Sequence, residues 1–260
     1  FNVTSTYTFP GDGAMVVDNA FNFVGSLPET INRIGVDLQM PMTATRVEYL
    51  GLGPWENHSD RSAGAWLGRF TTTTHNMFVP YTRPQHCGNR FGTRWATVTN
   101  PATGNGLLFV AGSTMDFSAL PWSAKEIDAC RYPVDLPASS ATHIALDGAQ
   151  IGLGGASCGP GPLPEYQLRP TARTFRYTIL PVGKPSDPAT LARTQFGVCG
   201  GVTISRDKTG TVTLTCSTPG AKIMYCPNGC INPCCCNKAK AYTGPFVTKS
   251  ACTIAAMATA

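Results

Sequence analysis

The chain is divided into many short segments of strand-like alternation, and this pattern restricts the available folds most strongly. Turn-forming residues separate the segments, and the 260 residues include 27 Gly and 21 Pro. Short strands joined by tight turns are typical of antiparallel sandwiches, whereas parallel α/β folds need a helix between successive strands. The sequence therefore predicts an all-β fold.

The first two thirds of the chain contain most of the predicted strands. They cover residues 1–9, 16–24, 34–40, 46–52, 95–99, 107–111, 115–118, 143–146 and 174–180. One short helix is predicted at residues 123–130, because Ser123 can cap it and Glu126 occupies its third position. Trp95, inside a strand pattern, is expected in the core.

The chain begins with Phe1 inside a predicted strand, in which Val3, Ser5 and Tyr7 share one face. We expect a processed piece or fragment, the C-terminal part of a longer protein. Such a piece should leave a sheet edge or an apolar face exposed, which would favour a homo-oligomer.

The Pro- and Gly-rich stretch at residues 181–188 predicts a boundary between two units. The predicted division is a large sandwich at 1–182, a linker at 183–192 and a small second sandwich at 193–260. In the second unit, strands are predicted at residues 202–205, 211–217, 222–226, 246–250 and 253–259.

Composition argues against two classes of partner. Only 13% of residues are charged, and the net charge of +5 is dispersed rather than gathered in a basic stripe, so nucleic acid is not expected. No apolar run reaches the ~20 residues that a membrane helix needs.

Four strings point to a family. They are YLGLGPWENHSDR at 49–61, RPQ at 83–85, DGAQIGLGGASCGP at 147–160 and PEY at 164–166. In this order they resemble the C-terminal small-chain domain of lac-type β-galactosidases, in glycoside hydrolase family 2, over about residues 7–182. The resemblance implies a galactose-mutarotase-like supersandwich that is truncated at its N-terminal end.

The resemblance also implies that catalysis takes place in another part of the parent enzyme. The parent enzymes hydrolyse terminal β-galactosides with retention, and their two catalytic glutamates lie in a β/α barrel outside this region. We therefore expect no catalytic residue in this chain, which would instead wall the active-site cleft and brace the barrel domain or large chain. The parent family often uses Mg and Na, but no cofactor or metal site is expected here.

Some residues are expected near the substrate. In the resembled enzymes, the loop at 154–160 carries a Trp that stacks on the sugar; here Cys158 stands in its place, in a loop one residue shorter. The resemblance thus marks Ser157, Cys158 and Gly159 as substrate-proximal. Trp55, next to Pro54, is the tryptophan most expected to be exposed, and His58 could touch a sugar hydroxyl.

The remaining polar residues favour structural roles. Asp60 and Arg61 are expected to bind each other or to anchor backbone groups. A retaining glycosidase needs two carboxylates ~5 Å apart. Glu48 is expected to face solvent and Glu56 to cap or form an ion pair, as most carboxylates do. His86 and Cys87 stand where the resembled family commonly has Glu-Asn.

Two other functions stay open at this point. The chain could be a stand-alone carbohydrate-binding module. It could also be an enzyme like the mutarotases, whose acid–base pair would require His75, His86 or His143 within hydrogen-bond reach of Glu165.

Cysteines are concentrated in the second unit. Eight of the eleven lie there, namely Cys199, Cys216, Cys226, Cys230, Cys234, Cys235, Cys236 and Cys252. Their spacing fits disulfides better than a zinc or iron–sulfur template. Disulfides would suit an exported protein, periplasmic or extracellular. Cys87, Cys130 and Cys158 are expected to be free, buried or half-buried thiols. Three strings, at 217–225, 242–246 and 253–257, resemble the immunoglobulin-like module at the C-terminus of chitobiases.

Overall fold

The chain forms two compact units, residues 1–189 and 190–260, and each is described by itself. The computed structural model describes residues 1–9, 13–155, 158–184, 186–195, 202–216, 221–226, 239–248 and 254–259.

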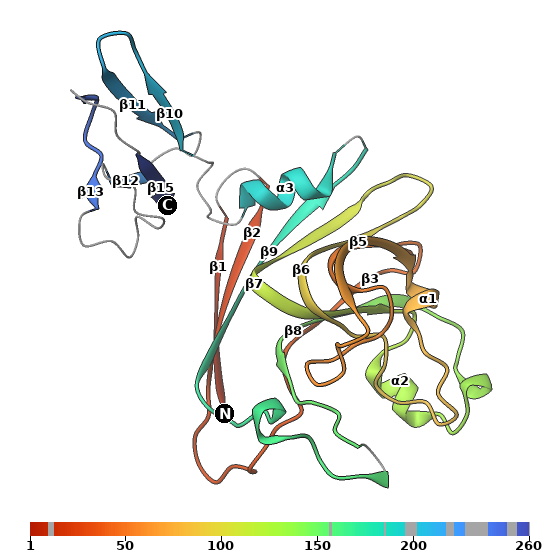
Figure 1. Ribbon diagram of the computed structural model, residues 1–260. Coiled ribbons are helices and arrows are strands. Elements are labelled where there is room, and N and C mark those ends of the chain that lie inside the picture. The colour runs from red at the N-terminus through yellow and green to blue at the C-terminus, as the bar shows by residue number, and fades with distance from the viewer. Residues whose placement is uncertain are drawn as a thin grey trace. The chain divides into compact units, whose positions relative to one another are not determined.

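Unit 1 is built on one large antiparallel sheet, which confirms the all-β prediction (Figure 1). The sheet contains nine strands among the described residues: β1 (Asn2–Thr8), β2 (Met15–Asn22), β3 (Arg33–Pro41), β4 (Arg46–Gly53), β5 (Trp66–Thr73), β6 (Arg90–Thr99), β7 (Gly106–Leu120), β8 (Ala141–Gln150) and β9 (Arg173–Val182).

The sheet forks at β7. β6 pairs with one edge of β7 at both ends of the strand. On its other edge, residues 106–111 pair with β9, whereas residues 116–120 pair with β8. One branch therefore continues through β9, β2 and β1, and the other through β8 and β3. Figure 1 shows β1, β2 and β9 side by side, with β8 and β3 leaving β7 in a different direction.

Strands of both branches contribute side chains to one core in unit 1. In β4, Val47 and Tyr49 are buried while their neighbours are not, as expected of a strand with one face turned inward. They pack in one cluster with Phe109 of β7 and Leu146 of β8. Trp95 is buried, as predicted.

Besides the strands, three α-helices and two 3-10 turns have bounds within the described residues. They are α1 (Thr74–Met77), α2 (Ala124–Ala129), α3 (Pro188–Gln195), η1 (Pro133–Asp135) and η3 (Pro164–Tyr166). The predicted helix is confirmed as α2, and the Ser123–Glu126 capping box is present. Helix α3 was not predicted and begins inside the expected linker at 183–192, although Asp187 followed by Pro188 is a helix-start signal. None of the described helices has the length and hydrophobicity that a bilayer crossing requires.

Strand β5 was missed because it carries little burial signal. Among the described strands it pairs with β4 alone, and Trp66 and Leu67 are exposed on it. β1 is the opposite edge of the sheet and has β2 as its one partner within the described part; all seven of its residues are exposed.

Unit 2 contains two small antiparallel sheets in its described part. Their strands are β10 (Thr203–Arg206), β11 (Thr211–Thr215), β12 (Lys222–Cys226), β13 (Lys240–Ala241), β14 (Phe246–Val247) and β15 (Ala255–Thr259). Val212, Leu214 and Ile223 form a small core, and the ring of Tyr225 stacks on that of Phe246 at 4.5 Å.

The predicted disulfides gain no support from the described cysteines, no two of which are bridged. Six of the eight candidates lie outside the described residues: Cys199, Cys230, Cys234, Cys235, Cys236 and Cys252. In unit 1, Cys87, Cys130 and Cys158 are free thiols, but Cys158 is exposed rather than buried or half-buried.

Candidate functional site

The loop after β4, residues 54–61, is called here the Trp55 loop. Asn57 holds it in place. The Asn57 side chain donates to the carbonyl oxygens of Leu52 at 3.1 Å and Trp55 at 2.7 Å, and it accepts from the Phe91 amide at 3.0 Å. The Trp55 side chain projects outward and is 74% exposed. The predicted exposure of Trp55 is thus confirmed. The hydrogen bonds of Asn57 fix the backbone of the loop that carries it.

Glu56 anchors the same loop to its neighbours. Its carboxylate accepts hydrogen bonds from the Tyr81 hydroxyl at 2.6 Å and the Gly88 amide at 2.6 Å, and it pairs with Arg61. Burial alone would raise the pKa of Glu56, but these hydrogen bonds and the Arg61 charge hold it below the usual value. A carboxylate held in this way is an ion-pair anchor, as the sequence indicated, and a poor general acid.

Asp60 ties the Trp55 loop to a second loop. Its Oδ2 accepts a hydrogen bond from the Gly154 amide at 2.7 Å. Of the two predicted roles, Asp60 therefore anchors backbone, whereas Arg61 pairs with Glu56 rather than with Asp60. Gly152 passes so close that a Cβ there would lie 2.7 Å from Asp60 Oδ2.

The second loop, residues 151–162, is called here the Cys158 loop. The Gly155 amide donates to the Pro160 carbonyl at 2.8 Å, which closes the loop on itself. Cys158 and Gly159 are exposed, and Ser157 lies outside the described residues. The aromatic side chain of the Trp55 loop and the thiol of the Cys158 loop are thus presented on two loops that share a hydrogen bond.

His58 does not lie on the surface, so that part of the prediction is wrong. It is 2% exposed, and its ring lies 5.7 Å from that of His86. Burial lowers the pKa of His58 to about 4, and His86 acts in the same direction. A neutral buried imidazole is not presented to a sugar, so of the two suggested sugar contacts only Trp55 is exposed.

Glu48 also departs from expectation. Its side chain is half-buried and pairs with Arg69 of the neighbouring strand β5, so it does not simply face solvent. Glu165 lies in η3, and within the described residues no hydrogen bond or ion pair joins it to His75, His86 or His143. The acid–base pair required by the mutarotase alternative is therefore not formed by these residues.

Two buried carboxyl groups lie beneath the Trp55 loop. Neither was predicted as a site residue from the sequence. Asp116 of β7 and Asp147 of the neighbouring strand β8 are partners in the antiparallel register of these two strands. Asn89 donates to Asp116 at 2.6 Å and to the Asn57 carbonyl at 3.0 Å, so the carboxyl group supports the loop through one amide. The Gln150 amide donates to Asp147 at 2.7 Å.

Burial controls the titration of this pair. It raises the pKa of Asp116 to about 7, with a further rise from the nearby Asp147 and a partial opposition from the Asn89 hydrogen bond. It also raises the pKa of Asp147 to about 6, against the charge of Arg33 and the Gln150 hydrogen bond. The sequence carried no signal for their burial. Asp116 alternates with Met115 and Phe117, and Asp147 alternates with Ile144 and Leu146 across the pleat, so apolar alternation would turn both carboxyl groups away from the core.

The described part of the chain contains no group of three or more His, Cys, Asp or Glu side chains that could hold a metal ion. The site is thus an exposed aromatic and an exposed thiol on two connected loops, supported by buried polar groups.

Comparison with known proteins identifies relatives of this chain. The family model described as "Beta galactosidase small chain" matches residues 1–180. The chain is similar to the β-galactosidase of Priestia megaterium (36% identity over 150 residues, 58% of this chain and 14% of the relative). It is also similar to the β-galactosidases of Streptococcus thermophilus (32% identity, 68% and 17%) and Lactobacillus delbrueckii subsp. bulgaricus (35% identity, 70% and 18%). The chain thus spans less than a fifth of the length of these relatives.

Proposed function

Because this chain belongs to the β-galactosidase small chain family, we propose that it is the C-terminal part of a β-galactosidase. In this proposal it walls the active-site cleft of the parent enzyme and supplies neither the acid nor the nucleophile. The barrel domain or large chain of the parent is its partner, and a terminal β-galactoside is the substrate.

The family match over residues 1–180 is the observation that carries this proposal. The matched relatives are β-galactosidases, and the segments matched make up only 14–18% of their length. Two of the glutamates considered as catalytic candidates have structural roles, since Glu56 is bound to three donors and Glu48 to Arg69. Such a chain fits a supporting role in a larger enzyme.

The face formed by the Trp55 and Cys158 loops is the proposed cleft wall. A hollow of about 330 Å³ lies beside Trp55, lined also by Asp60 and Arg61. An aromatic ring suits the apolar face of a pyranose, and polar groups suit its hydroxyls. Trp55 would therefore supply the aromatic surface that Cys158 cannot.

A chimera tests the proposal. Residues 1–180 of this chain would replace the matching segment of the Lactobacillus delbrueckii subsp. bulgaricus β-galactosidase. We expect the enzyme deleted of that segment to be inactive, the chimera to hydrolyse o-nitrophenyl β-galactoside, and the 260-residue chain alone to be inactive. Turnover by the isolated chain, or an inactive chimera that assembles normally, would refute the proposal.

The Trp55→Ala variant of this chimera tests the sugar contact. We expect kcat/KM to fall roughly 3- to 10-fold, the size of a single aromatic contact. Trp66→Ala is the matched control, because Trp66 is also exposed but does not line the hollow beside Trp55. An equal loss in both variants, or no loss in Trp55→Ala, would contradict the assignment.

The parent protein is also proposed to be exported, on the strength of the cysteine-rich second unit. The intact mass of the protein from its native source, measured with and without reductant, gives the number of bridged cysteines. A fully reduced native protein would argue for the thiolate alternative and against export.

A further inference from the structure

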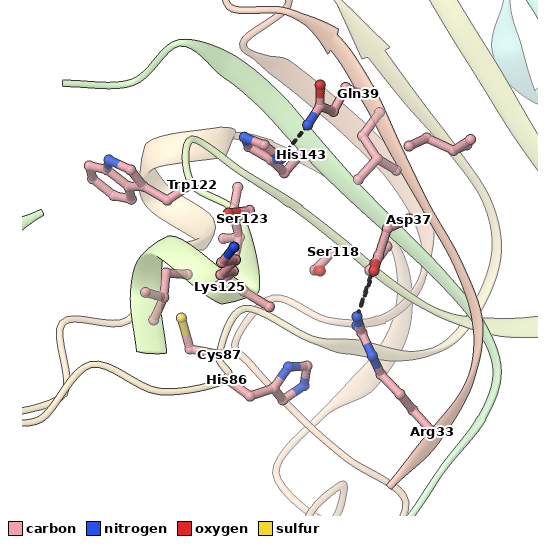
Figure 2. A pocket seen from close by; sticks show the side chains of 16 residues that line it. Arg33, Asp37, Gln39, His86, Cys87, Ser118, Trp122, Ser123, Lys125 and His143 are labelled. Atoms are coloured by element: carbon pink, nitrogen blue, oxygen red, sulfur yellow. Dashed lines mark hydrogen bonds and ion pairs between the residues drawn. The ribbon is translucent and has the colours of Figure 1, made fainter. Parts of the chain in front are cut away.

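A pocket of about 430 Å³ lies at the far end of the β8–β3 branch, next to α2. Its lining comes from β3, β7, β8, the start of α2 and the segment before β6 (Figure 2). The lining includes Gln39, His86, Ser118, Trp122, Ser123 and His143. Neither Trp55 nor Cys158 lines it, so it is distinct from the proposed cleft wall.

Trp122 gives this pocket a fixed aromatic wall. Its indole nitrogen donates to the Pro137 carbonyl at 2.7 Å, and its ring meets the ring of Phe78 edge-on at 5.0 Å. The ring of His75 is also in a T-shaped arrangement with the Trp122 ring, with the two centroids 5.8 Å apart. The orientation of the indole is therefore set before any ligand arrives, which lowers the entropy lost on binding.

His143 offers an unused hydrogen-bonding atom. The amide nitrogen of Gln39 lies 3.5 Å from His143 Nδ1. In the tautomer that carries its proton on Nε2, Nδ1 can accept from this amide. Within the described residues, Nε2 has no hydrogen-bond partner; the nearest carboxylate oxygen, that of Glu126, is 3.6 Å away. A ligand hydroxyl could accept from Nε2.

Three charged side chains line the pocket, namely Arg33, Asp37 and Lys125, and the first two form an ion pair. Arg33 binds Asp37 at 2.9 Å and lies 3.6 Å from the carboxylate of Asp147. Figure 2 shows this ion pair at one side of the pocket and Trp122 at the other. Burial lowers the pKa of His86, which favours its neutral form. Lys125 lines the pocket from an exposed position on α2. Apart from Lys125, the polar lining is neutral or ion-paired, which suits a neutral polar ligand.

We propose that this pocket is a binding site for a neutral saccharide, a monosaccharide or one residue of a longer glycan. An aromatic wall, hydroxyl groups and neutral imidazole and amide groups are the complement of a pyranose, with its apolar face and its ring of hydroxyls. The volume lies within the range of ~300–1,000 Å³ typical of small-molecule sites. The inference does not depend on the catalytic role of the parent enzyme.

Saturation-transfer NMR and calorimetry on the 260-residue chain test the proposal. The probes are methyl β-D-galactopyranoside, methyl β-D-glucopyranoside, methyl α-D-mannopyranoside and lactose, with galacturonate as the anionic comparison. We expect millimolar binding of at least one neutral probe. Trp122→Ala and His143→Ala should each weaken it by about 10-fold, the effect of ~1.4 kcal/mol, and Trp66→Ala should leave it unchanged.

A third variant keeps the test decisive if Trp122→Ala fails to fold. Ala124 is exposed at the start of α2 and lines the pocket, so Ala124→Leu fills the space without disturbing the core. The same loss of binding is expected. The proposal is overturned by no binding of any neutral probe, by binding that survives Ala124→Leu and His143→Ala, or by preference for galacturonate. Binding lost instead in Trp55→Ala would assign the sugar to the cleft wall.

Discussion

The protonation of Asp116 and Asp147 is coupled to the folding of unit 1. Their pKa values are raised to about 7 and about 6 in the folded chain, whereas unfolded aspartates titrate near ~3.9. Between these values the folded state binds more protons than the unfolded state. Their contribution to stability is therefore greatest below about pH 4 and declines as the pH rises towards 7.

The Asp116→Asn variant tests this coupling. An amide cannot ionise, and its oxygen can still accept from Asn89, so the variant escapes the loss at high pH. We expect its Tm to exceed that of the wild type by roughly 5 °C at pH 8 and by little at pH 4, as linkage predicts for a buried group. Thermal unfolding across this range is the measurement. Asp128→Asn, at an exposed position of α2, is the control. A pH-independent difference would show that Asp116 is already ionised at low pH.

Residue environments were predictable where they depend on local chain geometry. Trp55 follows a Gly-Pro turn and was expected to be exposed, which it is. Glu56 was expected to cap or to form an ion pair, and it pairs with Arg61. His58 and Asp116 were not foreseen as buried, because their burial depends on partners from remote segments. Asn89, for example, approaches Asp116 from 27 positions away.

At the scale of elements, the pairing of β3 with β8 depends on one glycine. The register shifts between Ile34 and Gly35, and Gly35 then faces Asp147. A Cβ at Gly35 would lie 1.9 Å from a carboxylate oxygen of Asp147 and 2.4 Å from the Leu146 carbonyl oxygen. Backbone cannot give way as a flexible side chain can, so no larger residue fits without moving a strand.

Gly35→Ala should therefore destabilise unit 1. We expect a loss of about 1–3 kcal/mol, typical of overpacking, and a Tm lower by ~5 °C. Gly64→Ala is the matched control, since a Cβ there meets nothing within 4 Å. Urea titration followed by tryptophan fluorescence compares the two. Equal stability of both variants would mean that the strands can separate at Gly35 without loss.

Elements with a local signal were predicted well, and those defined by tertiary pairing were not. The capping box of α2 lies within four residues and was found. β7 was predicted as two strands, at 107–111 and 115–118, but it is one strand of 15 residues. Its pairing with β6 is irregular there: Thr93 and Trp95, two positions apart, pair with Met115 and Val110, five positions apart. The apparent break is the point at which the sheet forks.

At the scale of the whole molecule, the chain divides into two units with separate cores. The core of unit 2 centres on Val212, Leu214 and Ile223, and the family match ends within unit 1. We therefore expect unit 1 to fold by itself.

A chain ending at Gln195, which keeps α3 whole, tests this independence. We expect calorimetry to show the main transition of the full chain at an unchanged Tm, within about 2 °C, because the core of unit 1 is intact. An unfolded product, or a Tm lowered by more than ~5 °C, would show that unit 2 stabilises unit 1.

The fold class was predictable from the sequence, and the order of the strands was not. Alternation and turn residues indicate that a segment is extended, but they carry no information on which strands meet. β2 pairs with β9 across more than 150 positions of sequence, for example Val17 with Tyr177. Such pairings are selected by the packing of the assembled core.

The fork at β7 affects how unit 1 is expected to unfold. Both edges of β7 are occupied, by β6 on one side and by β9 and then β8 on the other. Neither branch can detach from this shared strand without exposing core residues that also line the other branch. Damage to one branch is thus transmitted to the second, and the unit should melt as one cooperative block rather than fray from either side.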